Sequence, residues 1–307
     1  MKKALVGLFL LSTILFGNEN LLSIYDNILI KNNINKEDKK EIIKSFGDFV
    51  KSWKSVEGFY ILGDLDDNYL DTPRYIDTFH QGNEDIKKQL DLIIEEKEDL
   101  SISLYKNSHK TINALEYILF TKDLKNERVK NIALIITSNL EEKLTEILNG
   151  YMETKQKFLK DEVTANAIML NSLIENSYKM KEWRIGDPSG LSRKFKGKAS
   201  NERAEYYLSK NSIVAIKSIL STHLKLLGMQ KFKNFGSMIR SYSVNEELDD
   251  AIKYLKNSLK NTEMIKNDNF ADADELYKSL KKLHSTYYIS LIGKLKVTAK
   301  ILDADGD

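Results

Sequence analysis

Helix-breaking residues are scarce in this chain, and that scarcity limits the folds open to it. Only two of its 307 residues are proline, Pro73 and Pro188. Lys, Leu and Ile are the commonest residues, and such a composition favours long helices when breakers are so few. No stretch of any length alternates between apolar and polar residues as a half-buried strand would. We therefore predict an all-α fold of two helical bundles packed side by side, with a cleft between them.

One concentrated break divides the helical pattern. Apolar residues at helical spacing predict a long helix over 126–160. Further helices are predicted over 161–183, 213–227, 246–259 and 273–302. Residues 184–191 interrupt the pattern, because they contain two glycines and a proline within five positions. We therefore expect an N-terminal helical domain over 18–183 and a C-terminal helical bundle over 184–307.

The first residues have the pattern of a targeting signal. Lys2 and Lys3 precede an apolar run over residues 4–16, and Gly17 follows as a small residue suited to cleavage. The run is shorter than the roughly 20 apolar residues that a membrane-spanning helix needs. The sequence therefore predicts a signal peptide over 1–17, no transmembrane span after its removal, and a periplasmic location.

Charge and cysteine content exclude other classes of protein and site. The chain has 47 basic and 45 acidic residues and a net charge of +2. This balance lacks the basic excess of a nucleic-acid-binding protein. Because there is no cysteine, there is no disulfide, no thiolate metal site and no lipid attachment of the lipoprotein kind. We expect no nucleic-acid partner and an exported protein that is not a lipoprotein.

In the first half of the chain, Glu116 is a charged residue at a position where burial is expected. It lies in a predicted helix over 108–120, for which Ser108 is the expected N-cap. Glu116 falls at the edge of the apolar arc of this helix, which consists of Ile112, Leu115, Ile118 and Leu119. Burying an unpaired carboxylate is very unfavourable. Glu116 therefore has an arginine, a hydroxyl or a metal as partner, or else the helix edge is open to water.

Two other groups of polar residues follow helical spacing. Arg74 and Asp77 are three residues apart and share one side if their segment is helical. They form either a local ion pair worth less than about 1 kcal/mol, or a site in which Arg74 neutralises Glu116 or binds an anion. Glu205, Ser209 and Ser212 have offsets of four and seven, which place them on one helical stripe. This stripe is either a self-satisfied polar network or part of a binding site.

These elements together resemble the imelysin family. Its signature is often written Gly-x-His-x-x-Glu and is followed by an apolar tail like the one after Glu116. At the matching positions this chain has Thr111 in place of the Gly and Asn113 in place of the His. The other matching residues are Arg74 and Asp77, then Arg184, Gly186, Pro188 and Gly190, then Glu205, Ser209 and Ser212.

The resemblance implies a periplasmic binding protein associated with the acquisition of iron or another metal, with no catalytic role. The founding member was described as an insulin-cleaving metalloproteinase, so a metallopeptidase is one alternative. A structural helical envelope protein is another. The His proposed as a metal ligand in the family is Asn113 here, and none of the four histidines lies in a His-Glu-x-x-His motif. The resemblance therefore favours binding over peptide cleavage, with an envelope protein as a further partner.

We expect the polar elements to meet in one cleft between the two halves. The predicted cleft residues are Arg74, Asp77, Asn113, Glu116, Glu205, Ser209 and Ser212. Glu116 and Glu205 are the predicted metal ligands. Three carboxylates against one arginine offer the oxygen ligands that a hard cation such as ferric iron prefers. The predicted ligand is thus a metal ion or a small molecule, with iron or another divalent or trivalent metal as the candidate.

Overall fold

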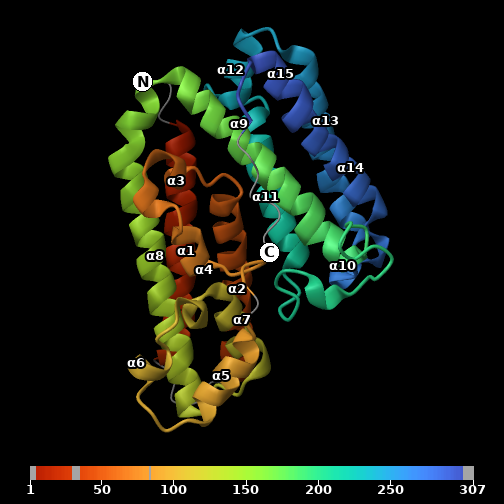
Figure 1. The fold of residues 1–307 in the computed structure, drawn as a ribbon. Helices are drawn as coiled ribbons and strands as arrows, with labels where there is room; N and C mark the ends of the chain where they lie inside the picture. The colour runs from red at the N-terminus through yellow and green to blue at the C-terminus, as the bar shows by residue number, and fades with distance from the viewer. Residues whose placement is uncertain (1–4, 30–34, 83, 300–307) are drawn as a thin grey trace.

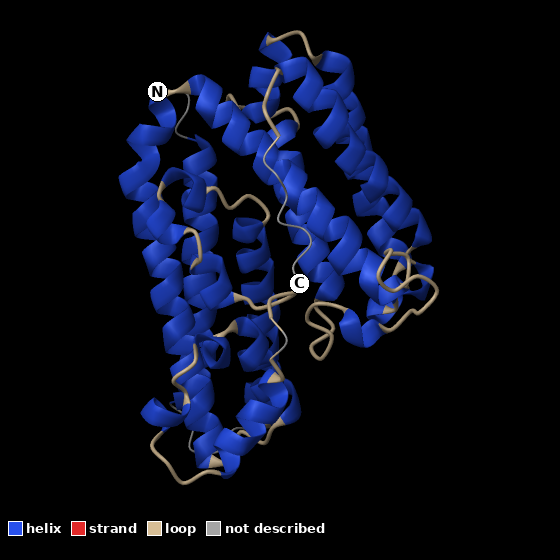
Figure 2. Ribbon diagram, viewed as in Figure 1, coloured by secondary structure: helices blue, strands red, loops and turns tan. Residues whose placement is uncertain are grey.

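The computed structural model describes residues 5–29, 35–82 and 84–299, and these residues form helices joined by turns and loops (Figure 1). None of them lies in a β-strand, as Figure 2 shows. The predicted all-α class is confirmed. Among the described helices, none combines the length and the apolar character needed to cross a membrane.

The longer helices carry most of the chain. They are α1 (Leu5–Leu29), α2 (Lys36–Glu57), α5 (Ile86–Glu95), α7 (Ile112–Thr121), α8 (Glu127–Lys160), α9 (Glu162–Lys179), α11 (Ser212–Leu227), α12 (Phe235–Ser241), α13 (Asn245–Asn261) and α14 (Asp274–Ser285). The short α-helices are α3 (Leu62–Leu65), α4 (Thr72–Ile76), α6 (Leu100–Ser103), α10 (Asp187–Ser189) and α15 (Ile292–Leu295). Two π-helical turns are η3 (Met180–Gly186) and η8 (Thr286–Leu291). The 3₁₀ turns are η1 (Asp67–Tyr69), η2 (Asn107–Lys110), η4 (Asn201–Arg203), η5 (Thr262–Met264), η6 (Lys266–Asp268) and η7 (Phe270–Asp272).

Asx caps explain where several helices begin. Asn126 accepts hydrogen bonds from the backbone N–H groups of the first turn of α8, which then runs for 34 residues. Asp161 caps α9 in the same way, and Asn35 caps α2 with a full capping box. The helix predicted over 126–160 is therefore confirmed almost to the residue.

The cap predicted for the Glu116 helix is wrong. Ser108 lies in the 3₁₀ turn η2, and its hydroxyl donates to Glu84 at 2.8 Å. The helix begins one turn later, because Thr111 is extended and its hydroxyl accepts from the N–H of Ala114. The predicted C-terminal helix is shorter than expected, since α14, the π-helical turn η8 and α15 follow one another without a gap and end at Leu295. Its expected last residues, from 300 on, lie outside the described residues.

The helices lie in two groups that contact each other (Figure 1). In the first group α1 packs against α2 and α8, and in the second α13 packs against α14. Helix α11 packs against both α2 and α13, so it joins the groups. One apolar core runs through both. The division predicted at 183/184 falls inside η3, and the two-domain assignment remains a prediction.

The predicted signal peptide overlaps helix α1, whereas its residues 1–4 lie outside the described residues. Ile14 is buried, and an ideal Cβ on Gly17 would lie 3.0 Å from Leu144 in α8. Gly17 thus allows α1 to approach α8 closely. The predicted cleavage point falls within α1, and the signal peptide remains a prediction.

Candidate functional site

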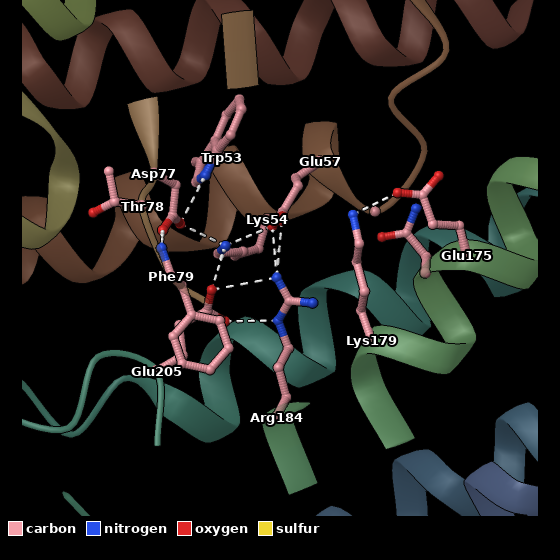
Figure 3. Close-up of polar contacts among 12 residues, drawn as sticks. Trp53, Lys54, Glu57, Asp77, Thr78, Phe79, Glu175, Lys179, Arg184 and Glu205 are labelled. Atoms are coloured by element: carbon pink, nitrogen blue, oxygen red, sulfur yellow. Dashed lines mark hydrogen bonds and ion pairs between the residues drawn. The ribbon is translucent and has the colours of Figure 1, made fainter. Parts of the chain in front are cut away.

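Five charged side chains meet where α2 faces the second group of helices (Figure 3). We call this set the charged junction, and it consists of Lys54, Glu57, Asp77, Arg184 and Glu205. Lys54 is its centre and is 0% exposed. The Lys54 Nζ lies 2.5 Å from Glu57 Oε2, 2.6 Å from Asp77 Oδ2 and 2.6 Å from Glu205 Oε1. The three ammonium protons thus have one carboxylate each.

Arg184 is the second cation of the charged junction. It comes from the π-helical turn η3 and is 2% exposed. Its Nε donates to Glu205 Oε2 at 2.7 Å, and its Nη2 lies 2.9 Å from Glu57 Oε1. The remaining nitrogen, Nη1, is buried without a hydrogen-bond partner. Arg184 therefore holds the two glutamates in place but leaves one donor unsatisfied.

Asp77 has the largest number of donors around it. Besides Lys54, its carboxylate accepts from Trp53 Nε1 at 3.2 Å, from the Tyr206 hydroxyl at 2.5 Å and from the Phe79 backbone N–H at 2.9 Å. Burial by itself would raise the pKa of Asp77, but Lys54 and these hydrogen bonds outweigh it and hold the pKa at about 2. Asp77 is therefore ionised at neutral pH.

Burial and ion pairing oppose each other at the remaining members of the junction. Burial lowers the pKa of Lys54, but the carboxylates of Asp77, Glu205 and Glu57 raise it by more. The net pKa therefore lies above its ordinary value, and the ammonium stays charged.

The pKa values of Glu57 and Glu205 shift in opposite directions. Burial raises the pKa of Glu57, and Arg184 with Lys54 more than reverses this. At Glu205 the effect of burial exceeds that of Arg184 and Lys54, so the pKa is raised. The cations do not compensate fully, because three carboxylates share only two of them.

The charged junction has the ligand geometry of a cation site, yet the protein fills it with its own cation. Among the described residues, Glu57, Asp77 and Glu205 are the one group of at least three His, Cys, Asp or Glu side chains whose ligand atoms lie within 4.8 Å of one another. The distances of 2.5–2.6 Å from Lys54 Nζ to their oxygens resemble the roughly 2.3–2.6 Å of calcium–oxygen bonds. With Lys54 in place, these residues do not fit a bare metal ion.

Glu116 lies near Asp77 of the charged junction, but its hydrogen-bond partner is Ser209, which is not a member of the junction. It is 6% exposed, and its Oε1 accepts from the Ser209 backbone N–H at 2.8 Å and the Ser209 hydroxyl at 2.6 Å. Burial raises its pKa to about 7, although both Ser209 hydrogen bonds oppose the rise. Of the partners predicted for Glu116, the structure shows a hydroxyl.

Arg74 does not neutralise Glu116, and that prediction is wrong. Its side chain is 65% exposed and pairs with Asp71 at 3.3 Å. Helix α4 ends at Ile76, and Asp77 is already extended. Because the helix stops there, Arg74 and Asp77 do not share a helical face, and only Asp77 reaches the junction.

The predicted stripe of Glu205, Ser209 and Ser212 is also wrong as a helical feature. Residues 205–210 form turns, and Tyr206 and Lys210 have φ values of 55° and 56°. Because the chain turns back on itself, Glu205 points to Lys54 and Arg184 whereas Ser209 points to Glu116 (Figure 3 shows Glu205).

Ser212 and Asn113 form hydrogen bonds to residues outside the charged junction. Ser212 opens α11, and its backbone N–H donates to Asp268 at 2.7 Å. Asn113, at the position of the family His, accepts from the backbone N–H of Thr78 at 2.7 Å and from its hydroxyl at 3.0 Å. Asn113 thereby fixes the loop that carries Asp77.

Sequence reasoning missed Lys54 altogether and gave Arg184 no role beyond a motif match. The signal for Lys54 was present, because it lies among the apolar residues of α2, next to Trp53 and four residues after Val50. A lysine on a buried helix face requires carboxylate partners. No comparable pattern identifies Arg184 or Tyr206.

A family model and two crystal structures match most of this chain. The family model described as Imelysin (peptidase M75) matches residues 28–287. A crystal structure of an imelysin-like protein from Psychrobacter arcticum has a TM-score of 0.78 and 17% identity, over 95% of this chain and 93% of that one. A crystal structure of a "putative iron-regulated protein A precursor" from Parabacteroides distasonis has a TM-score of 0.73 and 13% identity, over 96% and 94% of the two chains. No curated protein matches this chain significantly.

Proposed function

The chain belongs to the imelysin family, and on this premise we propose that it is a non-catalytic binding protein of the cell envelope whose ligand contains iron. The binding site is the charged junction together with Glu116 and Ser209. The observation that carries the proposal is the meeting of five charged side chains at one place, four of them buried and the fifth, Glu57, 20% exposed. Buried ion pairs add little to stability compared with apolar packing, so their concentration here favours a role in binding.

Three features around the junction support a binding site. His80, Tyr206 and Lys210 have positive φ values without being glycine, and such strain of about 1–3 kcal/mol each gathers at functional sites. Arg184 lies on a π-helical turn, another feature that is frequent at functional sites. The pKa of Glu116 is raised to about 7 by burial, as is typical of site residues.

The assignment of iron and the lack of catalysis have separate support. A neighbour in the structure comparison is described as iron-regulated, and the family resemblance associates imelysin-like proteins with iron acquisition. The one group of three candidate ligands among the described residues contains no histidine. The side chain of Asn113 is engaged with Thr78. These points favour binding over peptidase chemistry.

The location is part of the same proposal. The signal pattern over 1–17 supports export to the periplasm, and the absence of cysteine from the sequence supports a protein without a lipid anchor. A binding protein of this kind passes its ligand to a partner in the envelope.

Titration calorimetry with ferric citrate tests the proposal. We expect the Glu205→Gln and Glu116→Gln variants each to lose affinity by about tenfold or more, because each replaces a carboxylate of the site with a neutral amide. The matched control is Arg74→Ala, which removes an exposed charge and leaves the junction intact, so its affinity should equal that of the wild type. Equal affinity in all four proteins would place the site elsewhere, and absence of binding by the wild type would refute the proposal.

A further inference from the structure

The segment that connects Arg184 to Glu205 contains an exposed basic loop. We define the basic loop as residues 191–203, with the sequence LSRKFKGKASNER. It has five basic residues and one acidic residue, so its net charge is 5 − 1 = +4, whereas the whole chain has only +2. The side chains of Arg193, Lys194, Lys196 and Lys198 are exposed. The surface therefore carries a local excess of positive charge.

This charge is not neutralised by the rest of the described chain. The four exposed cations of the basic loop form no ion pair with a described acidic side chain, whereas Lys40, Lys44 and Lys278 at other exposed positions do. Glu202, the one acidic residue of the loop, is itself exposed. The positive potential thus faces solvent.

The loop holds its charges on a defined backbone. The Gly197 N–H donates to the Gly190 carbonyl at 2.9 Å, and the Ser200 N–H donates to the Pro188 carbonyl at 2.8 Å. The guanidinium of Arg203 lies 4.1 Å from the centre of the Phe195 ring. Gly190 and Gly197 supply the positive φ values, 72° and 75°, that the turns require. The basic loop is therefore an organised surface.

Both ends of the basic loop join the charged junction. At its start, the Leu191 N–H donates to the carbonyl of Gly186 at 2.8 Å, two residues after Arg184. At its end, Arg203 precedes Glu205 by two residues. The positive charge of the loop therefore lies in the segment that links Arg184 to Glu205, and the sign of a ligand's charge decides whether this segment attracts it.

We propose that the basic loop attracts the ligand as an anionic, oxygen-rich complex of a metal and repels the free metal cation. This inference rests on the proposed function and names the class of its ligand. Lys54 already supplies a cation at the centre of the three carboxylates, so the site has no need of a bare ion. A clustered positive surface raises the association rate of anions by about 10–10³-fold. The effect decays over about 10 Å at 0.1 M salt.

Stopped-flow association with ferric citrate in excess citrate, an anionic complex, tests this inference. The loop variant carries Arg193→Gln, Lys194→Gln, Lys196→Gln and Lys198→Gln. The matched control carries Lys253→Gln, Lys256→Gln, Lys260→Gln and Lys281→Gln, which remove the same charge from exposed positions on α13 and α14. We expect the association rate of the loop variant to fall about tenfold or more at roughly 10 mM salt, and the difference to shrink at roughly 0.2 M. The control should stay within about twofold of the wild type.

The outcomes separate this inference from the function on which it rests. Equal association rates in the loop variant and the control, with ferric citrate still bound, would overturn the inference and leave the proposed function standing. Tight binding of free Mn²⁺ by the wild type would overturn it as well, because the ligand would then be a cation. Absence of any ferric citrate binding by the wild type would overturn both.

Discussion

The apolar core of α1, α2 and α8 and the charged junction share helix α2, yet they are built on different kinds of contact. In the core, Phe46 and Phe49 are fully buried among other apolar residues. The stabilisation from such burial scales with area and has no direction. In the junction, Lys54 contacts Glu205 across 151 positions of sequence, through a hydrogen bond of 2.6 Å. Each contact there depends on one specific partner.

The difference predicts how each region responds to damage. A shortened core residue leaves a cavity that its neighbours partly fill, so the loss of stability depends on local repacking. A missing member of the junction leaves opposite charges buried without compensation, which repacking does not relieve. The junction should therefore be the more sensitive region per atom removed.

The largest expected effect comes from removing the cation at the centre of the junction. Lys54→Ala leaves Glu57, Asp77 and Glu205 short of one positive charge, and should lower the free energy of unfolding by about 3–5 kcal/mol. Urea denaturation measures it. The control on the same helix is Lys51→Ala, an exposed position, which should change stability by about 0.5 kcal/mol or less. Similar losses in the two variants would show that the junction contributes no more than the surface does.

A smaller effect, which depends on pH, is expected at Glu116. Burial raises its pKa from 4.5 to about 7. Between these two values the folded protein holds the proton and the unfolded chain has released it, so the free energy of unfolding falls as pH rises. The shift in pKa corresponds to a loss of about 3 kcal/mol in the free energy of unfolding. This loss is complete above pH 7 and absent below about pH 4.

Glu116→Gln isolates this titration, because the amide oxygen still accepts from Ser209 and no longer ionises. The variant should be more stable than the wild type at pH 8 and equally stable at pH 4, as measured by urea denaturation at both values. The same pH dependence in both proteins would show that Glu116 does not cause it.

The smallest expected effect tests a local contact outside the junction. Thr111→Ala removes the hydroxyl that caps α7 and should lower the free energy of unfolding by about 1 kcal/mol. Ser108→Ala removes a hydroxyl that contacts Glu84 at an exposed site and should cost less. Thermal or urea unfolding of the two variants compares them, and a larger loss for Ser108→Ala would reinstate Ser108 as the cap.

The candidate site was only partly predictable. Lys54 contacts both Asp77 and Glu205, and Ser209 donates to Glu116, but the assignment of these residues to a binding site remains a prediction. Arg74 was expected beside Glu116 and lies on the surface instead. Its assignment assumed that α4 continued past Ile76, and one turn less of helix changes where Asp77 points. Short segments carry too few residues for periodicity to fix such an end.

The sequence by itself determined the all-α class and the course of the long helices, because helical periodicity and Asx caps act over a few residues. Helix α8 follows the predicted pattern from its cap at Asn126. Only the tertiary structure decided which charges meet, since Glu116 and Ser209 are 93 positions apart and Lys54 and Glu205 are 151 apart. Such pairs leave no periodic trace along the chain. Their geometry follows from how the helices pack and from the turns over 205–210.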